Sequence, residues 1–203
     1  MLLEAKTVSF GYTKNQSVFT DISLAIDAGE RVALIGPSGC GKSTLAKVLA
    51  GYLKPSSGQV LFDGKHLPEE GYCPVQLIYQ HPEKAINPRW KLGRTLNEAW
   101  TPDETFLEDM GIEQQWLSRY PAELSGGEMQ RFCIARALGP QTKFIIADEI
   151  STMLDVITQA QIWELMLDIV NKRKLGLLVV THSSDLAEKT CDRIVMFENI
   201  SGE

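Results

Sequence analysis

Residues Gly36 to Ser43 constrain the fold of this chain more than any other stretch. They read GPSGCGKS and fit the phosphate-loop pattern G-x-x-x-x-G-K-[ST]. Directly before them stands the run Val32 to Ile35, which is apolar at every position, as expected for a parallel strand covered on both faces. Helix-forming residues follow from about Lys42 to Ala50. A strand, a glycine-rich loop and a helix in this order predict an α/β core.

The loop pattern has a chemical reason. Its glycines let successive backbone N–H groups turn toward phosphate oxygens, and the positive N-terminal end of the next helix points at the same place. Lys42 would neutralise the β- and γ-phosphates, and Ser43 would ligate Mg²⁺. The alternative is a glycine-rich turn with a surface lysine. Four fixed positions match by chance in about one of a hundred chains of this length, and the placement between strand and helix makes chance rarer still, so nucleotide binding is favoured.

A second polar site follows another apolar strand. The run Lys143 to Ala147 ends in Asp148 and Glu149. Asp148 can hold a Mg²⁺-bound water, and Glu149 can polarise the water that attacks a γ-phosphate. Taken alone, the pair is explained as well by a strand that leaves the core at a polar turn. The phosphate loop upstream favours the catalytic interpretation.

The stretch 124–128 reads LSGGE and has two interpretations. One is a capping box, with Ser125 as N-cap and Glu128 three residues on, opening a helix from Gly126 to about Leu138. The box does not explain two consecutive glycines in the first turn, which cost about 1 kcal/mol each relative to Ala. That cost makes sense if bare backbone N–H groups must approach an anion.

The order of the remaining elements predicts the layout of the fold. The first 30 residues favour an antiparallel strand pair, Leu3 to Phe10 and Val18 to Ile26. One helix is expected to open at Thr101 as N-cap and to close at Gly111. A helical stripe and further strands complete the pattern. The stripe is Ile162, Leu165, Met166 and Ile169, and the strands are Gln59 to Phe62, Val75 to Tyr79, Lys143 to Ala147, Leu177 to Thr181 and Ile194 to Phe197.

We therefore predict an α/β fold class: a P-loop NTPase core with a mixed or parallel sheet, an N-terminal antiparallel β-subdomain and an inserted α-helical subdomain. The chain is expected to form one domain over residues 1–203. Residues 1–81 and 141–203 would make the nucleotide-binding core with its β-subdomain, and residues 82–140 the helical part that carries the 124–128 stretch.

Composition narrows the functional classes. The 203 residues are 44% hydrophobic, yet no apolar run is long enough for a membrane helix, and no secretory signal is seen at the start, so the cytoplasm is expected. The 20 basic against 26 acidic residues argue against a general polyanion-binding surface, so no nucleic-acid partner is expected. The four cysteines lack C-x-x-C or metal-ligand spacing and are expected to be free thiols: Cys40, Cys73, Cys133 and Cys191.

From residue 1 almost to its end, the chain resembles the ATP-binding cassette (ABC) family of ATPases. The resemblance rests on six stretches in the family's order, and an ordered set is far more specific than a lone phosphate loop. They are Phe10-Gly11-Tyr12, the phosphate loop, Gln80 at a strand end, the signature 124–128, the Asp148-Glu149 strand, and Thr181-His182 after an apolar strand.

The resemblance implies a role for each matching residue. Glu149 would be the catalytic base, His182 the γ-phosphate switch and Lys42 the third catalytic residue. Gln80 would ligate Mg²⁺ with Ser43 and Asp148, and Tyr12 would stack on adenine. In isolation, Tyr12, Gln80 and His182 fit packing or turn roles as well. The ATP phosphates would be held by Gly36, Ser38, Gly39, Cys40, Gly41, Lys42, Ser43 and Thr44, the signature Ser125, Gly126, Gly127 and Glu128 would act in trans, and Asp155 would link the two sites.

Segment 80–90 indicates a subgroup within this family. It is similar to the segment after the Gln loop in ATPase subunits of peptide and nickel importers, with Ile86 in place of Leu. This implies an ATP-hydrolysing subunit that pairs with a second subunit, identical or not, and works with transmembrane permeases and a solute-binding protein at the cytoplasmic face of the membrane. The alternatives are a soluble ABC ATPase of repair or translation, and a low-turnover nucleotide-dependent regulator. The stretch between Lys42 and Ser125 is too short for the long coiled coil of repair types.

Four positions depart from the family's pattern. Ile150 stands where Pro is usual, Met153 where a small residue is usual, Glu128 where Gln is usual, and Ser183 where Asp often follows the histidine. None removes a phosphate or metal contact. They leave the turnover rate and the loop geometry open.

Overall fold

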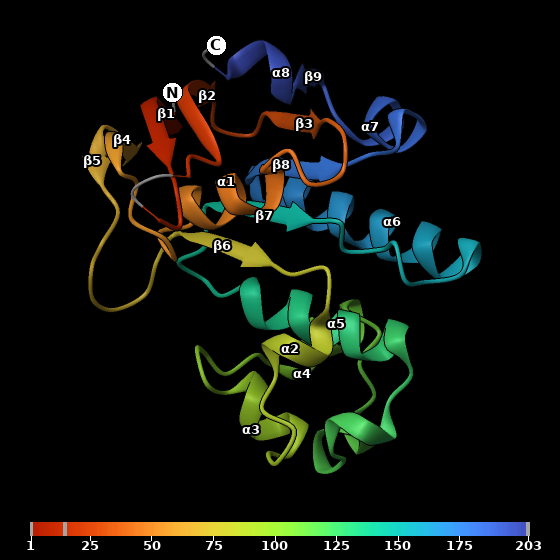
Figure 1. Ribbon diagram of the computed structural model, residues 1–203. Helices are drawn as coiled ribbons and strands as arrows, with labels where there is room; N and C mark the ends of the chain where they lie inside the picture. The colour runs from red at the N-terminus through yellow and green to blue at the C-terminus, as the bar shows by residue number, and fades with distance from the viewer. Residues whose placement is uncertain (1, 14–15, 202–203) are drawn as a thin grey trace.

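A computed structural model describes residues 2–13 and 16–201. Two sheets form its upper part, and a group of short helices lies below them (Figure 1). The antiparallel sheet has the order β2-β1-β4-β5, and its strands are β1 (Leu3–Phe10), β2 (Phe19–Ile26), β4 (Ser57–Phe62) and β5 (Lys65–His66). The predicted antiparallel pair at the start of the chain is therefore confirmed.

The second sheet is parallel throughout, with the order β6-β7-β8-β3-β9. Every residue of β7 and β8 is buried, because helices and the other sheet cover both faces. This is why their sequences read as continuous apolar runs rather than as alternating ones. The strands are β6 (Val75–Ile78), β7 (Phe144–Asp148), β8 (Gly176–Thr181), β3 (Arg31–Ile35) and β9 (Arg193–Met196).

The two faces of the parallel sheet belong to different parts of the core. Phe144 and Ile146 of β7 face the antiparallel sheet and α1 (Lys42–Leu49), while Ile145 and Ala147 face α5 (Gly126–Ala137) and α6 (Val156–Arg173). The predicted stripe on α6 is confirmed, although Leu165 is only partly buried. Helix α7 (Ser184–Thr190) packs beside β3, and α8 (Phe197–Ile200) follows β9.

Short helices follow one another between β6 and β7. They are α2 (Pro82–Ala85), α3 (Leu92–Leu96), α4 (Glu104–Asp109), the 3-10 helices Gln114–Ser118 and Pro121–Glu123, and α5. The predicted N-cap Thr101 is wrong. Helix α4 begins at Glu104, and the Asp103 side chain accepts a hydrogen bond from the N–H of Phe106 at 2.8 Å. A cap must stand immediately before the first turn, so Asp103 takes the role and Thr101 lies outside the helix. Gly111, at a φ of +62°, follows the helix as predicted.

The parallel strands end at a common edge, and this places the polar residues that follow them. Ile35, at the end of β3, pairs with Thr181 of β8, and Asp148 pairs with Val180. Ile78, at the end of β6, pairs with Ala147. Ligands of open α/β sheets bind at such a carboxyl edge.

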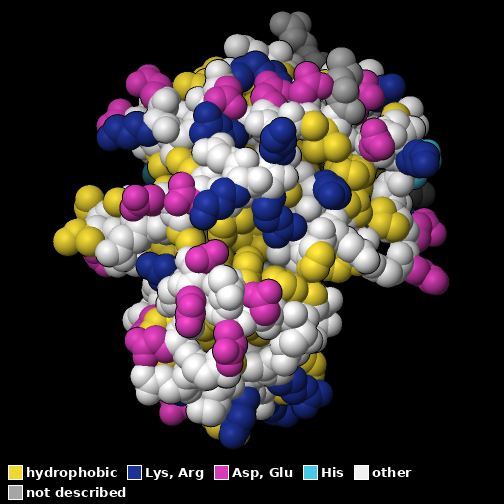
Figure 2. Space-filling model, turned by 180° about the vertical axis from the view of Figure 1, so that it is seen from behind, with side chains coloured by type: hydrophobic (Ala, Val, Ile, Leu, Met, Phe, Trp, Pro, Cys, Tyr) yellow, Lys and Arg dark blue, Asp and Glu magenta, His cyan; other side chains and the backbone are white. Residues whose placement is uncertain are grey.

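None of the helices among residues 2–13 and 16–201 has the length and apolar character needed to cross a bilayer. Figure 2 shows the rear face, where basic and acidic side chains are interspersed above, and where carboxylates dominate the middle of the lower, helical part.

Candidate functional site

The phosphate loop joins β3 to α1 in a conformation that needs glycine. Gly41 has a φ of +114°, which residues with a side chain rarely adopt. A Cβ on Gly36 would lie 3.0 Å from the Cβ of Phe197 and 3.1 Å from the Sγ of Cys40. Backbone shape therefore requires glycine at position 41, and close packing requires it at position 36.

Lys42 lies inside the loop, and only 5% of its surface is exposed. Its Nζ donates to the carbonyl oxygens of Gly36 at 2.7 Å and of Pro37 at 2.8 Å. A buried ammonium must be hydrogen-bonded, and here the loop's own main chain supplies the acceptors. A phosphate oxygen in the loop would be a stronger acceptor, because it carries charge.

Ser43 and Asp148 face each other across the site. The Ser43 hydroxyl donates to Oδ1 of Asp148 at 3.0 Å. Burial raises the pKa of Asp148, the hydrogen bond from Ser43 lowers it in part, and the neighbouring Glu149 raises it further. Burial thus outweighs the attraction of Lys42 and Lys47, and a cation beside the Asp148 carboxylate would offset its desolvation.

These two oxygen donors fit Mg²⁺, which prefers oxygen ligands and completes its shell with phosphates and water. Within the described part of the chain, no three His, Cys, Asp or Glu side chains gather to hold a metal by themselves. A cation between Ser43 and Asp148 would therefore take its further ligands from a bound phosphate and from water.

Glu149 is held from two sides. Its Oε2 accepts a hydrogen bond from Nε2 of Gln80 at 3.0 Å, and its Oε1 lies 3.3 Å from Nδ1 of His182. Its backbone is left-handed, with a φ of +48°, which is uncommon for a residue with a side chain and occurs at functional sites. The amide of Gln80 also donates to the Thr152 hydroxyl at 3.2 Å. Sequence reasoning missed Thr152; its only signal is the turn position three residues after Glu149.

Tyr12 stands at the mouth of the loop, with 64% of its surface exposed. Its hydroxyl is 3.2 Å from that of Thr44, and Phe10 packs edge-on against its ring at a centroid distance of 5.0 Å. A pocket of about 520 Å³ opens between Tyr12 and Glu149. Val18, which the sequence did not single out, lines it with Tyr12, Ser38, Gly39, Gly41, Lys42, Ser43, Thr44, Gln80 and Glu149.

A second pocket of about 380 Å³ adjoins the first on the far side of Ser43 and Gln80. Sequence reasoning did not single out most of its lining. Lys47 was detectable, because it follows Ser43 by four residues on α1 and so lies on the same helix face. The other lining residues are Tyr79, His81, Lys84 and Asp148.

The signature stretch lies elsewhere. Its capping box is confirmed: Oε2 of Glu128 accepts from the N–H of Ser125 at 2.6 Å, and the Ser125 hydroxyl accepts from the N–H of Glu128 at 3.3 Å. Among the described residues, no hydrogen bond joins residues 125–128 to the phosphate loop. A Cβ on Gly127 would lie 2.6 Å from Cγ2 of Thr158. Tertiary packing thus explains this glycine without an anion, which the sequence could not reveal.

Asp155 caps the neighbouring helix α6. Its Oδ1 accepts from the N–H groups of Ile157 and Thr158 at 3.0 Å, and its Oδ2 accepts from the Thr158 hydroxyl at 2.6 Å. The hydroxyl of Thr158, followed by its N–H, lowers the pKa of Asp155. The structure therefore brings Asp155 next to the signature.

The structure brings most of the other predicted site residues together at the sheet edge. They are Tyr12, the loop residues, Gln80, Asp148, Glu149 and His182.

Comparison with known protein families shows to which of them this chain belongs. The sequence model of the ABC transporter family matches residues 19–152 of this chain. The chain belongs to the ABC transporter family. It is an ATPase, as the ATP-binding subunits of that family are, and the family binds ATP.

Related sequences and solved structures align with nearly the whole of this chain. The nickel import system ATP-binding protein NikE of Staphylococcus aureus (strain MSSA476) is 33% identical over 98% of this chain and 87% of the relative. A solved ATP-binding subunit of an ABC transporter is 29% identical, with a TM-score of 0.77 over 97% of this chain and 85% of its own. The dimeric cassette MJ0796, bound to ADP and Pi, has the same fold at 24% identity, with a TM-score of 0.80 over 96% of this chain and 94% of its own.

Proposed function

We propose that this ABC ATPase powers an importer of nickel or of peptides, and that the sheet edge hydrolyses ATP with Mg²⁺. One observation carries the proposal: the phosphate loop, Asp148, Glu149, Gln80 and His182 converge at the carboxyl ends of adjacent parallel strands.

The pocket between Tyr12 and the loop suits a nucleotide. The exposed Tyr12 ring would stack on adenine, and Lys42 would exchange its two carbonyl acceptors for phosphate oxygens. The other phosphate contacts would come from Gly36, Ser38, Gly39, Cys40, Gly41, Ser43 and Thr44.

Ser43, Asp148 and Gln80 would hold Mg²⁺ against the phosphates. The bound ion would neutralise the charge that develops on the transferred phosphoryl group. Glu149, fixed between Gln80 and His182, would accept the proton of the attacking water at Oε1 or Oε2. His182 would donate to the γ-phosphate.

The signature is proposed to act in trans. Ser125 to Glu128 open α5 at the surface, away from their own loop, and α5 is long enough for its N-terminal N–H groups to favour an anion. A second ATPase subunit, identical or not, would bring its bound γ-phosphate to them, and Asp155 beside them would link the two sites.

The importer assignment rests on NikE, which is named for nickel import, and on the segment 80–90. Transmembrane permeases would complete the transporter, with a solute-binding protein supplying the cargo. The subunit would sit at the cytoplasmic face of the membrane. We divide the chain into the core, 1–81 and 141–203, and the helical part, 82–140, which would pass the movement to the permease.

The purified subunit tests the catalytic site. Glu149→Gln should retain ATP binding, measured by equilibrium dialysis, should release phosphate at least about a hundredfold more slowly, and should form an ATP-dependent dimer in light scattering. Thr152→Val, which removes a hydroxyl beside Gln80, serves as a control and should keep most activity. Undiminished phosphate release by Glu149→Gln would remove Glu149 from the catalytic role.

Reconstitution tests the cargo. The subunit and its permeases, placed in proteoliposomes with ATP inside, should accumulate either radiolabelled Ni²⁺ or a labelled oligopeptide. Purification of the tagged subunit with ribosomes or DNA-processing proteins alone would favour the soluble alternative. ATP binding without measurable turnover, with and without permease, would favour the regulator.

A further inference from the structure

A pocket of about 670 Å³ opens beside the antiparallel sheet. It lies between the last turn of α1, the strand β4 and the loop that follows β5. Figure 1 places β4 and β5 at the left edge of the molecule, and Figure 2, seen from behind, shows apolar side chains gathered on the corresponding right side. Among the described residues, none lines both this pocket and the one between Tyr12 and Glu149.

The wall of this pocket is mainly aliphatic. Val48 and Val60 are buried in the core between the two sheets, and Leu53 and Leu67 pack against that core while part of their surface stays exposed. Pro68 extends the wall toward solvent. An apolar ligand would cover this exposed aliphatic surface, and a pocket of this volume is large enough for a small molecule.

Two opposite charges line the same pocket at its exposed rim. Nζ of Lys54 lies 3.1 Å from Oε1 of Glu69, and the two side chains are 88% and 83% exposed. A pair so exposed contributes little to stability, because water screens it and both side chains must be held in place. Each of the two groups can therefore exchange its partner for a ligand group at little cost.

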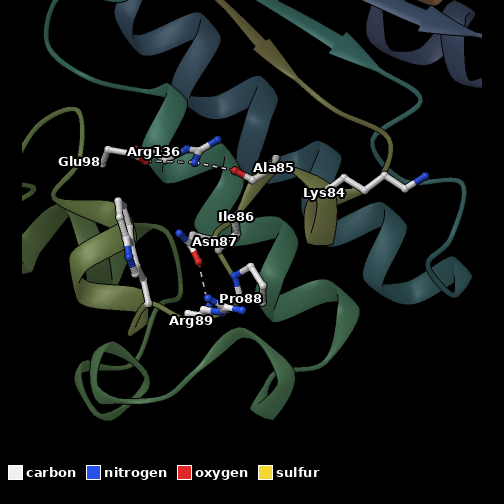
Figure 3. A pocket seen from close by; sticks show the side chains of 9 residues that line it. Lys84, Ala85, Ile86, Asn87, Pro88, Arg89, Glu98 and Arg136 are labelled. Atoms are coloured by element: carbon white, nitrogen blue, oxygen red, sulfur yellow. Dashed lines mark hydrogen bonds and ion pairs between the residues drawn. The ribbon is translucent and has the colours of Figure 1, made fainter.

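The pocket on the helical part, shown in Figure 3, differs in this respect. Nη1 of Arg136 donates there to the main-chain carbonyl of Ala85 at 2.8 Å, so this guanidinium holds the fold together. In the described ranges, the side chains of Lys54 and Glu69 pair only with each other. They can turn toward a ligand without loss of a contact that supports the fold.

We propose that the pocket beside the antiparallel sheet binds a small zwitterion with apolar side chains, namely an apolar amino acid or dipeptide. The ligand's carboxylate would pair with Lys54 and its ammonium with Glu69, while its side chains would lie against Leu53, Leu67 and Pro68. A zwitterion suits this rim better than a simple anion or cation, because either of those would leave one of the two charges without its partner.

The position of the pocket separates this ligand from the nucleotide. Helix α1 begins at Lys42 of the phosphate loop, and Val48 in its last turn lines the pocket. A bound zwitterion would therefore contact the far end of the phosphate-loop helix without entering the loop. Saturating ATP should leave the zwitterion in place.

A titration with chosen ligands tests the chemistry. The probe is leucyl-leucine, added to the ¹⁵N-labelled subunit without nucleotide and followed by NMR. Alanyl-alanine should bind at least about tenfold more weakly, because it covers less apolar surface. N-acetyl-leucyl-leucine amide, which lacks both terminal charges, should bind about tenfold more weakly, because both rim pairs are lost. Free leucine tests the other source, and the tighter of leucine and leucyl-leucine identifies the natural ligand's size.

Substitutions at the pocket test its location. Lys54→Glu places two carboxylates at the rim and should weaken leucyl-leucine binding about tenfold. Adding Glu69→Lys to Lys54→Glu exchanges the two charges and should restore most of the affinity, because a zwitterion can bind in the reverse direction. Gln59→Trp, at an exposed position of β4 that lines the pocket, should fill it and reduce binding below detection.

Controls separate binding from folding. Trp is well tolerated in strands, so the thermal unfolding midpoint of Gln59→Trp should stay near that of the unaltered subunit. Lys65→Gln removes an exposed positive charge on the neighbouring strand β5 and should leave the affinity for leucyl-leucine unchanged.

Several results would overturn the proposal. They are equal binding of leucyl-leucine and its capped form, unchanged binding by Gln59→Trp, no recovery in the charge exchange, and no binding of either zwitterion by the unaltered subunit. Displacement of leucyl-leucine by saturating ATP would assign the ligand to the nucleotide site and also overturn it. ATP hydrolysis is measured separately, so each of these results leaves the proposed transport function standing.

Discussion

Substituting Gly127 by Ala tests why the signature has a glycine at this position. The new Cβ would lie 2.6 Å from Cγ2 of Thr158, well inside contact distance. The Thr158 side chain cannot turn away freely, because its hydroxyl donates to Asp155 at 2.6 Å. Overpacking of this kind costs about 1–3 kcal/mol. Ala gains about 1 kcal/mol over Gly in a helix. The net effect should be a loss of about 0–2 kcal/mol in the free energy of unfolding.

A double-mutant cycle isolates the clash. Thr158→Ser removes Cγ2 and keeps the hydroxyl for Asp155, so Gly127→Ala should be stabilising by about 0.5–1 kcal/mol in that background. Urea unfolding of the four proteins, without nucleotide, measures the difference. An equal loss of stability in both backgrounds would refute the assignment of the clash to Thr158.

The same four proteins address the signature's proposed role. The double variant should be well folded, yet it keeps a side chain in the first turn of α5, whose N–H groups are proposed to meet the partner's phosphate. We therefore expect stability without ATPase activity. Full activity in the stable double variant would mean that Gly127 serves packing alone.

Three further predictions concern titratable groups. Burial raises the pKa of Asp148, so its carboxylate destabilises the nucleotide-free fold at neutral pH, and this cost is relieved as the pH falls through the raised pKa. Asp148→Asn should therefore raise the thermal unfolding midpoint at pH 7, measured by calorimetry, and abolish ATPase activity. A lower unfolding midpoint would contradict this. The lowered pKa of Asp155 contributes stability that is present above its ordinary value of 3.8 and is lost as the pH falls through the lowered pKa. In Asp155→Asn, which can still cap α6, the free energy of unfolding in urea should decline less steeply over that pH range. Burial raises the pKa of Cys133 to about 12. Iodoacetamide at pH 8 should therefore leave Cys133 unlabelled in the native subunit, as judged by mass spectrometry. Prompt labelling would show that the core around Cys133 opens to the reagent.

Local chemistry made much of the site predictable. The phosphate loop needs glycines in fixed places, and the capping box of Ser125 and Glu128 is set by neighbours three residues apart, so both could be deduced without the fold. Parallel strands then place Asp148 and Glu149 beside the loop, because their carboxyl ends share one edge.

Tertiary contacts explain what the sequence could not show. The hydrogen bond from Gln80 to Thr152 joins residues 72 positions apart, and no local pattern announces it. The steric need for Gly127 comes from Thr158 on another helix. The wrong cap at Thr101 arose because Asp103 is also a good capping residue, and only the first turn of α4 decides between them.

The order of the parallel sheet has a consequence for stability across the molecule. β7, which ends in Asp148, lies inside the sheet with a paired strand on each side, and all its residues are buried. The segment 86–91 instead joins helices α2 and α3, of four and five residues, which are too short to be stable without their packing. The carboxylates proposed for catalysis thus follow a strand that we expect to be among the last parts of the fold to open. The helical part that is proposed to pass movement to the permease includes these less stable elements, and the segment after Gln80 links it to Glu149.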